Sequence, residues 1–204
     1  MTVVTGFSSF PGVELNPTGI LVEKWSRVAP EWASGDTHFE LLPVVYASAG
    51  ARIAELAADG RIENLIMLGV SAGSEAIRLE RFAFNYDDTA TPDSAGEVRQ
   101  GKVIDETGPH VMEAGYDMEA ARKSFLATSI ETHVSDSAGR YLCNHCYYVA
   151  LRSAERKASA FRPVFLHVPQ VIEAHHHAPD PLTDVGLTKL EEELGILIPW
   201  FREN

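Results

Sequence analysis

Six segments of the sequence carry the apolar runs or the apolar–polar alternation of β-strands: residues 3–6, 38–46, 64–70, 77–85, 130–134 and 162–168. The runs 64–70 and 162–168 are nearly unbroken, which is typical of strands that are buried on both faces of a parallel sheet. Pro43 weakens or ends the strand in which it lies, because proline has no N–H group to donate. The alternation in 77–85 predicts one half-exposed strand.

Between the strands, five segments have the spacing of helices: residues 17–28, 48–58, 118–127, 143–157 and 182–200. Asn16 before Pro17 is a favoured N-cap, and Asp117 is placed to cap the third helix. Pro199 is expected to break the last helix. Residues 87–108 are rich in Asp, Thr, Pro and Gly, so we expect a long excursion with little regular structure there.

The alternation of strands and helices predicts an α/β fold, a single-domain three-layer α/β/α sandwich with a mainly parallel twisted sheet. A chain of 204 residues, 45% of them hydrophobic, fits one domain that spans residues 1–204. Ligands of such sheets bind outside the carboxyl ends of the strands. We therefore expect the loops that follow Gly6, Val70 and His167 to converge on one crevice with Cys143.

The composition limits the classes of binding partner and the cellular compartment that we expect. The formal net charge of −12 argues against nucleic acid and anionic membranes as partners. No apolar run approaches the length of a membrane span, and no basic and apolar leader opens the sequence. With only two cysteines, a disulfide framework is not expected. A soluble, cytoplasmic protein is the expectation.

Cys143 stands where a small, turn-prone stretch meets an apolar stretch without Gly or Pro. A thiol at a helix N-terminus lies beside unpaired N–H groups and the positive end of the helix dipole, which favour its thiolate form. The same N–H groups can hold a developing oxyanion. Two other interpretations stay open on these residues alone: a packed structural cysteine, and a redox pair with Cys146.

A nucleophilic cysteine needs a base, and the base needs a group that fixes its orientation. His167 ends an apolar strand just before Val168-Pro169, and Glu80 lies among apolar neighbours. Each also has a simpler interpretation, because a lone strand histidine is more often a core residue and Glu80 has Arg78 and Arg81 nearby as ion-pair partners.

Four segments together resemble pyrrolidone carboxyl peptidases, also called pyroglutamyl peptidases I, a family of cysteine peptidases. They are TGFSSFPG followed by NPT at residues 5–18, LERFAFN at 79–85, SAGRYLCN at 137–144 and FLHVP at 165–169. The resemblance implies hydrolysis of the N-terminal pyroglutamyl residue of peptides through a Cys143 acyl-enzyme. It implies that His167 is the general base and then the acid, that Glu80 orients His167, and that Phe7 and Phe10, two exposed-looking aromatics in a loop, line the ring pocket.

The chain also departs from the family pattern. Pro11-Gly12 stands where the family usually has two glycines, and Val70 and Ser74 stand where it often has Gln and Arg. These differences leave open a catalytically impaired homologue that binds pyroglutamyl groups without turnover, beside the less favoured thiol redox protein. Cys146 has no family role and is expected to be a packed thiol.

No cofactor and no metal are expected. Glu173 and His175-His176-His177 offer metal-ligand types, but they lack the i,i+4 spacing of a helical zinc site, and a solvated loop is the better account. The resemblance allows a homodimer or a homotetramer.

Overall fold

The structure is a computed structural model that describes residues 1–10, 12–157, 161–171 and 184–204. In this part of the chain, the central sheet has six strands. Their order is β2 (Thr37–Leu42), β1 (Thr2–Phe7), β3 (Asn64–Ser71), β10 (Arg162–Pro169), β4 (Ile77–Glu80) and β9 (Thr132–Ser135). Every neighbouring pair is parallel except β10 and β4, so β4 and β9 run opposite to the other four strands.

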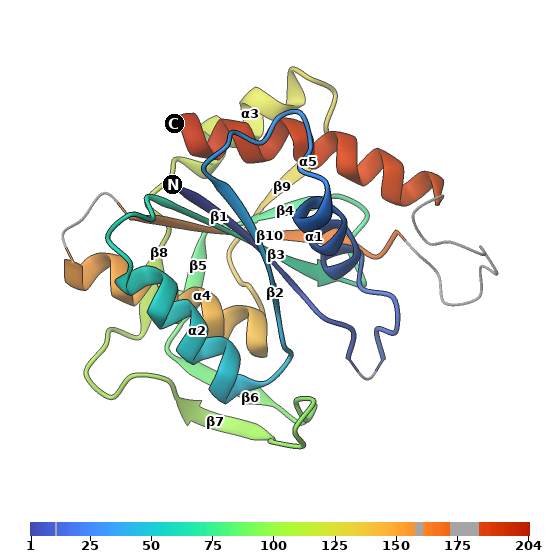
Figure 1. Cartoon of the computed structure of the whole chain (residues 1–204). Helices are drawn as coiled ribbons and strands as arrows, with labels where there is room; N and C mark the ends of the chain where they lie inside the picture. The colour runs from blue at the N-terminus through green and yellow to red at the C-terminus, as the bar shows by residue number, and fades with distance from the viewer. Residues whose placement is uncertain (11, 158–160, 172–183) are drawn as a thin grey trace.

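Helices cover both faces of this sheet. They are α1 (Pro17–Arg27), α2 (Tyr46–Ala58), α3 (Met118–Leu126), α4 (Leu142–Lys157) and α5 (Val185–Glu203). Figure 1 shows α2 and α4 on one face and α1, α3 and α5 on the other. The three-layer α/β/α sandwich with a mainly parallel sheet is therefore confirmed. The caps expected at Asn16 and Asp117 are also present, since each side chain accepts a hydrogen bond from an N–H of its helix.

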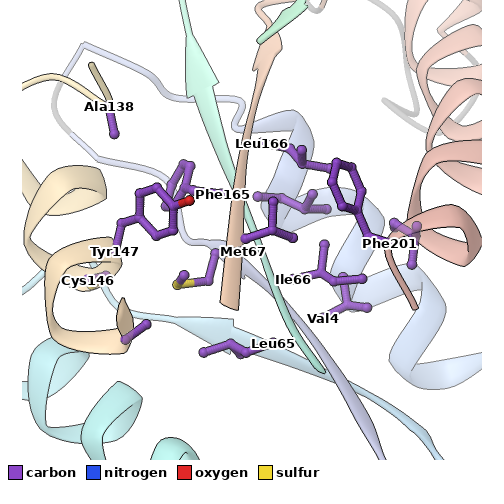
Figure 2. Close-up of a cluster of buried hydrophobic side chains, with 14 of the residues drawn as sticks. Val4, Leu65, Ile66, Met67, Ala138, Cys146, Tyr147, Phe165, Leu166 and Phe201 are labelled. Carbon is purple, nitrogen blue, oxygen red and sulfur yellow. The ribbon is translucent and has the colours of Figure 1, made fainter. Parts of the chain in front are cut away.

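Side chains alternate between the two faces of the sheet. Phe165 of β10 points toward Tyr147 of α4, whereas the next residue, Leu166, points toward Phe201 of α5 (Figure 2). All four side chains are fully buried. Because the side-chain period of a strand is two, His167 lies on the same face as Phe165. The strand therefore directs His167 toward the layer that contains α4.

Two glycines let β1 and α1 approach each other closely. A Cβ atom on Gly6 would lie 2.5 Å from the carbonyl oxygen of Thr18, and one on Gly19 would lie 2.5 Å from that of Phe7. Real Cβ atoms do not come this close to backbone oxygen, so both positions require glycine. The close crossing fixes the end of β1, and with it Phe7, relative to α1.

One strand ends at the proline that the sequence indicates, and another strand differs from its prediction. The strand expected over 38–46 ends at Leu42, before Pro43, and Tyr46 already begins α2 because the distant Asp93 carboxylate accepts its N–H at 2.9 Å. The half-exposed strand expected over 77–85 breaks at Arg81. Its first part, β4, is largely buried in the central sheet, and its second part, β5 (Phe82–Phe84), pairs with β8 (Val111–Glu113).

Two other segments are more regular than the sequence predicts. The excursion over 87–108 contains a hairpin in which β6 (Tyr86–Thr89) pairs with β7 (Arg99–Val103). Helix α5 continues through Pro199 to Glu203. The hydrogen bond that proline removes is offset by burial of Leu197, Ile198 and Phe201 on either side of it.

We predict that Gly19→Ala destabilises the protein. An alanine inside a helix normally stabilises by about 0.5–1 kcal/mol relative to glycine. Here the new methyl group would meet the Phe7 carbonyl, so we expect a net loss of about 1–3 kcal/mol in the free energy of unfolding. Urea unfolding of the variant measures this change.

Gly35→Ala is the matched control, because nothing lies within 4 Å of the Cβ that it would add. Its stability should be unchanged or slightly raised. A Gly19→Ala protein as stable as the wild type would show that β1 and α1 can separate at no cost.

Candidate active site

A cavity of about 380 Å³ opens where β1, β3 and β10 end and α4 begins. Most of its wall is apolar or aromatic. The lining residues are Phe7, Phe10, Asn16, Val44, Val70, Ser71, Arg78, Ser137, Ala138, Gly139, Tyr141, Leu142, Cys143 and His167. The convergence of strand ends that the sequence predicts therefore occurs, and it brings Cys143 and His167 to the same cavity.

Sheet register places a carboxylate behind His167. Arg78 of β4 pairs directly with His167 of β10, and side chains of directly opposed residues lie on the same face. Glu80, two residues along β4, shares that face. The Nδ1–H group of His167 donates to Glu80 Oε1 at 2.8 Å, and Glu80 has no solvent exposure.

The bond to Glu80 also sets the tautomer of His167. A carboxylate only accepts, so Nδ1 carries the proton and Nε2 is the nitrogen available to Cys143. Burial by itself lowers the pKa of His167, but the charge of Cys143, hydrogen bonds to Cys143 and Glu80, and the charge of Glu80 outweigh it and raise the pKa to about 9. With its pKa raised in this way, His167 is an imidazolium at neutral pH.

Cys143 lies in the first turn of α4. The Tyr141 carbonyl accepts from the His145 N–H at 3.1 Å, which marks the start of the helical hydrogen-bond pattern. The N–H groups of this first turn, including that of Cys143, have no partner within the helix. Gly139, with φ of 83°, makes the turn that leads into it. Gly69 leaves room for the thiol, since a Cβ there would lie 3.0 Å from Cys143 Sγ.

Buried polar side chains hold α4 in place against the segment that follows Glu80. The Asn144 amide accepts from the Phe84 N–H at 2.8 Å and donates to the carbonyls of Phe84 and Tyr86. One turn further, the Tyr147 hydroxyl donates to the Glu80 carbonyl at 2.9 Å. The helix that carries Cys143 and the strand that carries Glu80 are therefore joined directly.

The second cysteine has a different environment. Cys146 is fully buried, whereas Cys143 is half-buried on the cavity wall. Burial, with smaller contributions from the charges of Cys143 and Asp87, raises the pKa of Cys146 well above its ordinary value. Its thiol therefore stays protonated, which fits the packed cysteine that the sequence predicts.

The two phenylalanines lie at different depths. Phe7 is the last residue of β1 and is 3% exposed, with its ring 6.5 Å from that of Phe165. The expectation that both aromatics are exposed in a loop is therefore wrong for Phe7, because β1 extends one residue further than expected. Phe10 is half-buried and its ring lies 6.2 Å from that of Tyr141. Both rings nevertheless reach the cavity.

The profile of a family described as pyroglutamyl peptidase matches residues 1–187. The chain belongs to this family. It is 29% identical over 203 residues to the pyrrolidone-carboxylate peptidase of Thermococcus kodakarensis, covering 99% of this chain and 96% of that one. It is 31% identical over 172 residues to that of Gloeobacter violaceus, covering 84% and 82%.

Solved structures of pyroglutamyl peptidases share the fold. The pyrrolidone carboxyl peptidase of Fervidobacterium islandicum matches with a TM-score of 0.85 and 27% identity, covering 99% of this chain and 98% of that one. Pyroglutamyl peptidase I of Bacillus amyloliquefaciens matches with a TM-score of 0.81 and 26% identity, covering 96% and 93%. The resemblance that the four sequence segments predict is confirmed.

The positions that depart from the pyroglutamyl peptidase pattern have different surroundings. Val70 lies on the cavity wall, where it adds an apolar surface. Ser74 closes the turn after β3, donating to the Ala76 carbonyl at 2.7 Å, and is not among the lining residues. Gly12 has φ of 90°, which favours glycine, and Pro11 lies outside the described residues.

Sequence reasoning considered Arg78 only as an ion-pair partner of Glu80 and missed its place on the cavity wall. Its Nε lies 3.2 Å from Glu80 Oε1, whereas Arg81 pairs with Glu119 and Asp136 instead. The spacing in the sequence could have predicted this place, because Arg78 and Glu80 are two residues apart on one strand and their side chains must share a face of the sheet.

A second histidine–carboxylate pair connects His145 of α4 to Asp87 of β6. His145 Nδ1 lies 2.8 Å from Asp87 Oδ2, which Arg99 also contacts at 3.1 Å. These residues join the β6–β7 hairpin to α4. Neither side chain is among the described residues that line the cavity, so the pair has a structural role.

No group of three or more His, Cys, Asp or Glu side chains that could hold a metal occurs among the described residues. Glu173 and His175–177 lie outside them. Among the described helices, none combines the length and apolar character needed to span a membrane.

We predict that His167 keeps its proton to about pH 9, the value that its raised pKa implies. NMR titration of the histidine side chains, with His167 assigned from a His167→Asn variant, measures this. Both Cys143→Ala and Glu80→Gln should lower the pKa. Cys143→Ala removes the charge and hydrogen bond of the thiol group, and Glu80→Gln removes the carboxylate charge while leaving an amide oxygen that can accept from Nδ1.

Cys146→Ala is the matched control and should leave the titration of His167 unchanged. Because the pKa of folded His167 exceeds the ordinary value of 6.5, its stabilising contribution is complete below pH 6.5 and is lost as the pH rises through about 9. A wild-type His167 that titrates at 6.5 would contradict the coupling to Cys143 and Glu80.

Proposed function

We propose that the protein is a cysteine exopeptidase that removes the N-terminal pyroglutamyl residue from peptides, and that residues 1–204 form its single catalytic domain. One observation carries the proposal. Cys143 and His167 meet in a mostly apolar cavity, with Glu80 bonded to the far nitrogen of the His167 ring. This is the order of nucleophile, base and orienting group that acyl transfer needs.

In the proposed reaction, the Cys143 thiolate attacks the carbonyl carbon of the pyroglutamyl residue. The bond to the following nitrogen breaks, and His167 gives its proton to the leaving amine. The product is a thioester on Cys143. Neutral His167 then takes a proton from water, whose oxygen attacks the thioester, and pyroglutamate leaves as the thiolate re-forms beside the imidazolium.

Two features of the site support this sequence of steps. The unpaired N–H groups in the first turn of α4 lie beside Cys143, where negative charge develops on the carbonyl oxygen. Glu80 stabilises the imidazolium form of His167 and keeps its Nε2 directed to the thiol, without itself taking a proton.

The cavity fits an uncharged ring. A pyroglutamyl group is a lactam with no ammonium, so it needs apolar walls and few polar partners. Phe7 and Phe10 supply aromatic walls, and Val70 and Val44 supply aliphatic ones. Among the described residues, the lining contains no Asp or Glu that would hold a free N-terminal amine.

Two other functions stay as alternatives. The first alternative is a homologue that binds pyroglutamyl groups without turnover, and its basis is the departure from the family pattern at Val70 and Ser74. A measurement of turnover distinguishes it from an enzyme. A thiol redox protein needs Cys146 to react with Cys143. The burial of Cys146 and its raised pKa disfavour that exchange.

We propose a cytoplasmic location, because both cysteines are free and one lies at the proposed site. The proposed partners are pyroglutamyl peptides, with the chain assembled as a homodimer or homotetramer. Nucleic acid is not proposed as a partner, given the net charge of −12.

We predict that the purified, reduced protein cleaves a chromogenic pyroglutamyl amide and leaves the matching prolyl amide intact. The two substrates differ by the lactam oxygen and by the charge on the ring nitrogen, so their comparison tests the uncharged pocket. Release of the chromophore measures both reactions. Equal cleavage of the prolyl amide would show that the pocket does not select the lactam.

We also predict that iodoacetamide at mildly acidic pH modifies Cys143 first and that activity falls in step with labelling. Cys143 is half-buried on the cavity beside an imidazolium, whereas Cys146 is buried and protonated. Peptide mass spectrometry locates the label.

The matched variants are Cys143→Ser, which should be folded and nearly inactive, and Cys146→Ser, which should keep most activity. An inactive Cys146→Ser beside an active Cys143→Ser would overturn the assignment and favour the redox alternative.

A further inference from the structure

Arg78 joins the segments that build the proposed site. Its Nε lies 3.2 Å from Glu80 Oε1, the same oxygen that accepts from His167. Its Nη2 donates to Ser135 Oγ at 2.6 Å and to the Ser137 carbonyl at 3.0 Å. One guanidinium group thereby connects β4, the end of β9 and the loop that leads to Cys143.

The environment of Glu80 explains why such a group is needed. The carboxylate has no solvent exposure, and its Oε2 atom has no hydrogen-bond partner. A buried charge is costly unless cations compensate it. His167 compensates only while protonated, and in the proposed reaction it loses its proton when it protonates the leaving amine. Arg78 is charged at every stage.

The loop also needs an anchor. Residues 136–141 connect β9, which runs opposite to β10, to the start of α4 beside the cavity. Ser137 lies in this loop and on the cavity wall. The Nη2 contact with the Ser137 carbonyl holds the first part of the loop, and the contact with Ser135 holds the end of β9 that precedes it. Arg140, stacked 3.9 Å from the centre of the Phe84 ring, holds the second part.

We propose that Arg78 is a positioning residue of the active site. It holds the Glu80 carboxylate and the 135–137 segment in one fixed arrangement, so that His167 and Cys143 stay correctly placed relative to each other. The inference deepens the proposed function and rests on it. Arg78 acts through Glu80 and the loop, and no contact of Arg78 with the substrate is required.

Arg78→Met and Arg78→Lys separate the charge from the geometry. Arg78→Met removes the cation and all the guanidinium contacts, so kcat for the pyroglutamyl amide should fall by on the order of tenfold to hundredfold with KM little changed. The charge of Glu80 is then compensated by His167 alone, and the pKa of His167 should rise by about half a unit or more. Arg78→Lys keeps the charge, so His167 should titrate as in the wild type while kcat falls less.

Arg81→Met is the matched control. The Arg81 side chain is 32% exposed, against 33% for Arg78, and it is adjacent to Glu80 in the chain. It pairs with Glu119 and Asp136 at 3.7 and 3.5 Å and does not contact the Glu80 carboxylate. Its kcat and its His167 titration should match the wild type.

The histidine titration needs no substrate, so it tests Arg78 separately from the proposed function. A wild-type protein that does not cleave the amide overturns the function, while a raised pKa of His167 in Arg78→Met still supports the link through Glu80. Wild-type kcat and titration in Arg78→Met would overturn the positioning role. A raised KM at unchanged kcat would overturn it too, and would place Arg78 on the substrate. If Arg78→Met does not fold, Arg78→Gln replaces it with the same expected results.

Discussion

The buried carboxylate of Glu80 is the constraint on which the site depends. A fully buried charge must be compensated within the fold, and the cations that do so are His167 and Arg78. Both must lie on one face of the sheet and beside each other. The antiparallel pairing between β10 and β4 in the central sheet satisfies this requirement by setting Arg78 opposite His167. The change of strand direction therefore matters for the site as well as for the topology, because it places Arg78 and Glu80 beside His167.

A histidine–carboxylate pair occurs at two places in the molecule, and their surroundings differ. His145 and Asp87 form such a pair at the same distance of 2.8 Å as His167 and Glu80. His167 reaches the cavity and has the Cys143 thiol on its free side, whereas neither His145 nor Asp87 is among the described residues that line this cavity. In the proposed mechanism, the difference lies in the surroundings of the pair: strand ends that leave a hollow, and a helix whose first turn points the thiol into it.

Local signals predicted much of the fold. The buried strands β3 and β10, the caps at Asn16 and Asp117 and the start of α4 near Cys143 depend on side chains within a few residues, and the structure has them all. Distant partners caused the errors. The strand over 77–85 divides because β5 pairs with β8, and the segment over 87–108 forms a hairpin in which Asp87 contacts His145 of α4.

The sequence by itself determined which residue types were available and which segments carried them: a cysteine at a helix start, a histidine at a strand end and a carboxylate on an alternating strand. The roles of these residues remain predictions. Only the tertiary structure decided that Glu80 and His167, 87 positions apart, share a hydrogen bond, that Cys146 is buried while Cys143 is not, and that Arg78 reaches the cavity. The reason is physical. Periodicity fixes the face on which a side chain lies, whereas burial and the pairing of charges depend on which strands become neighbours.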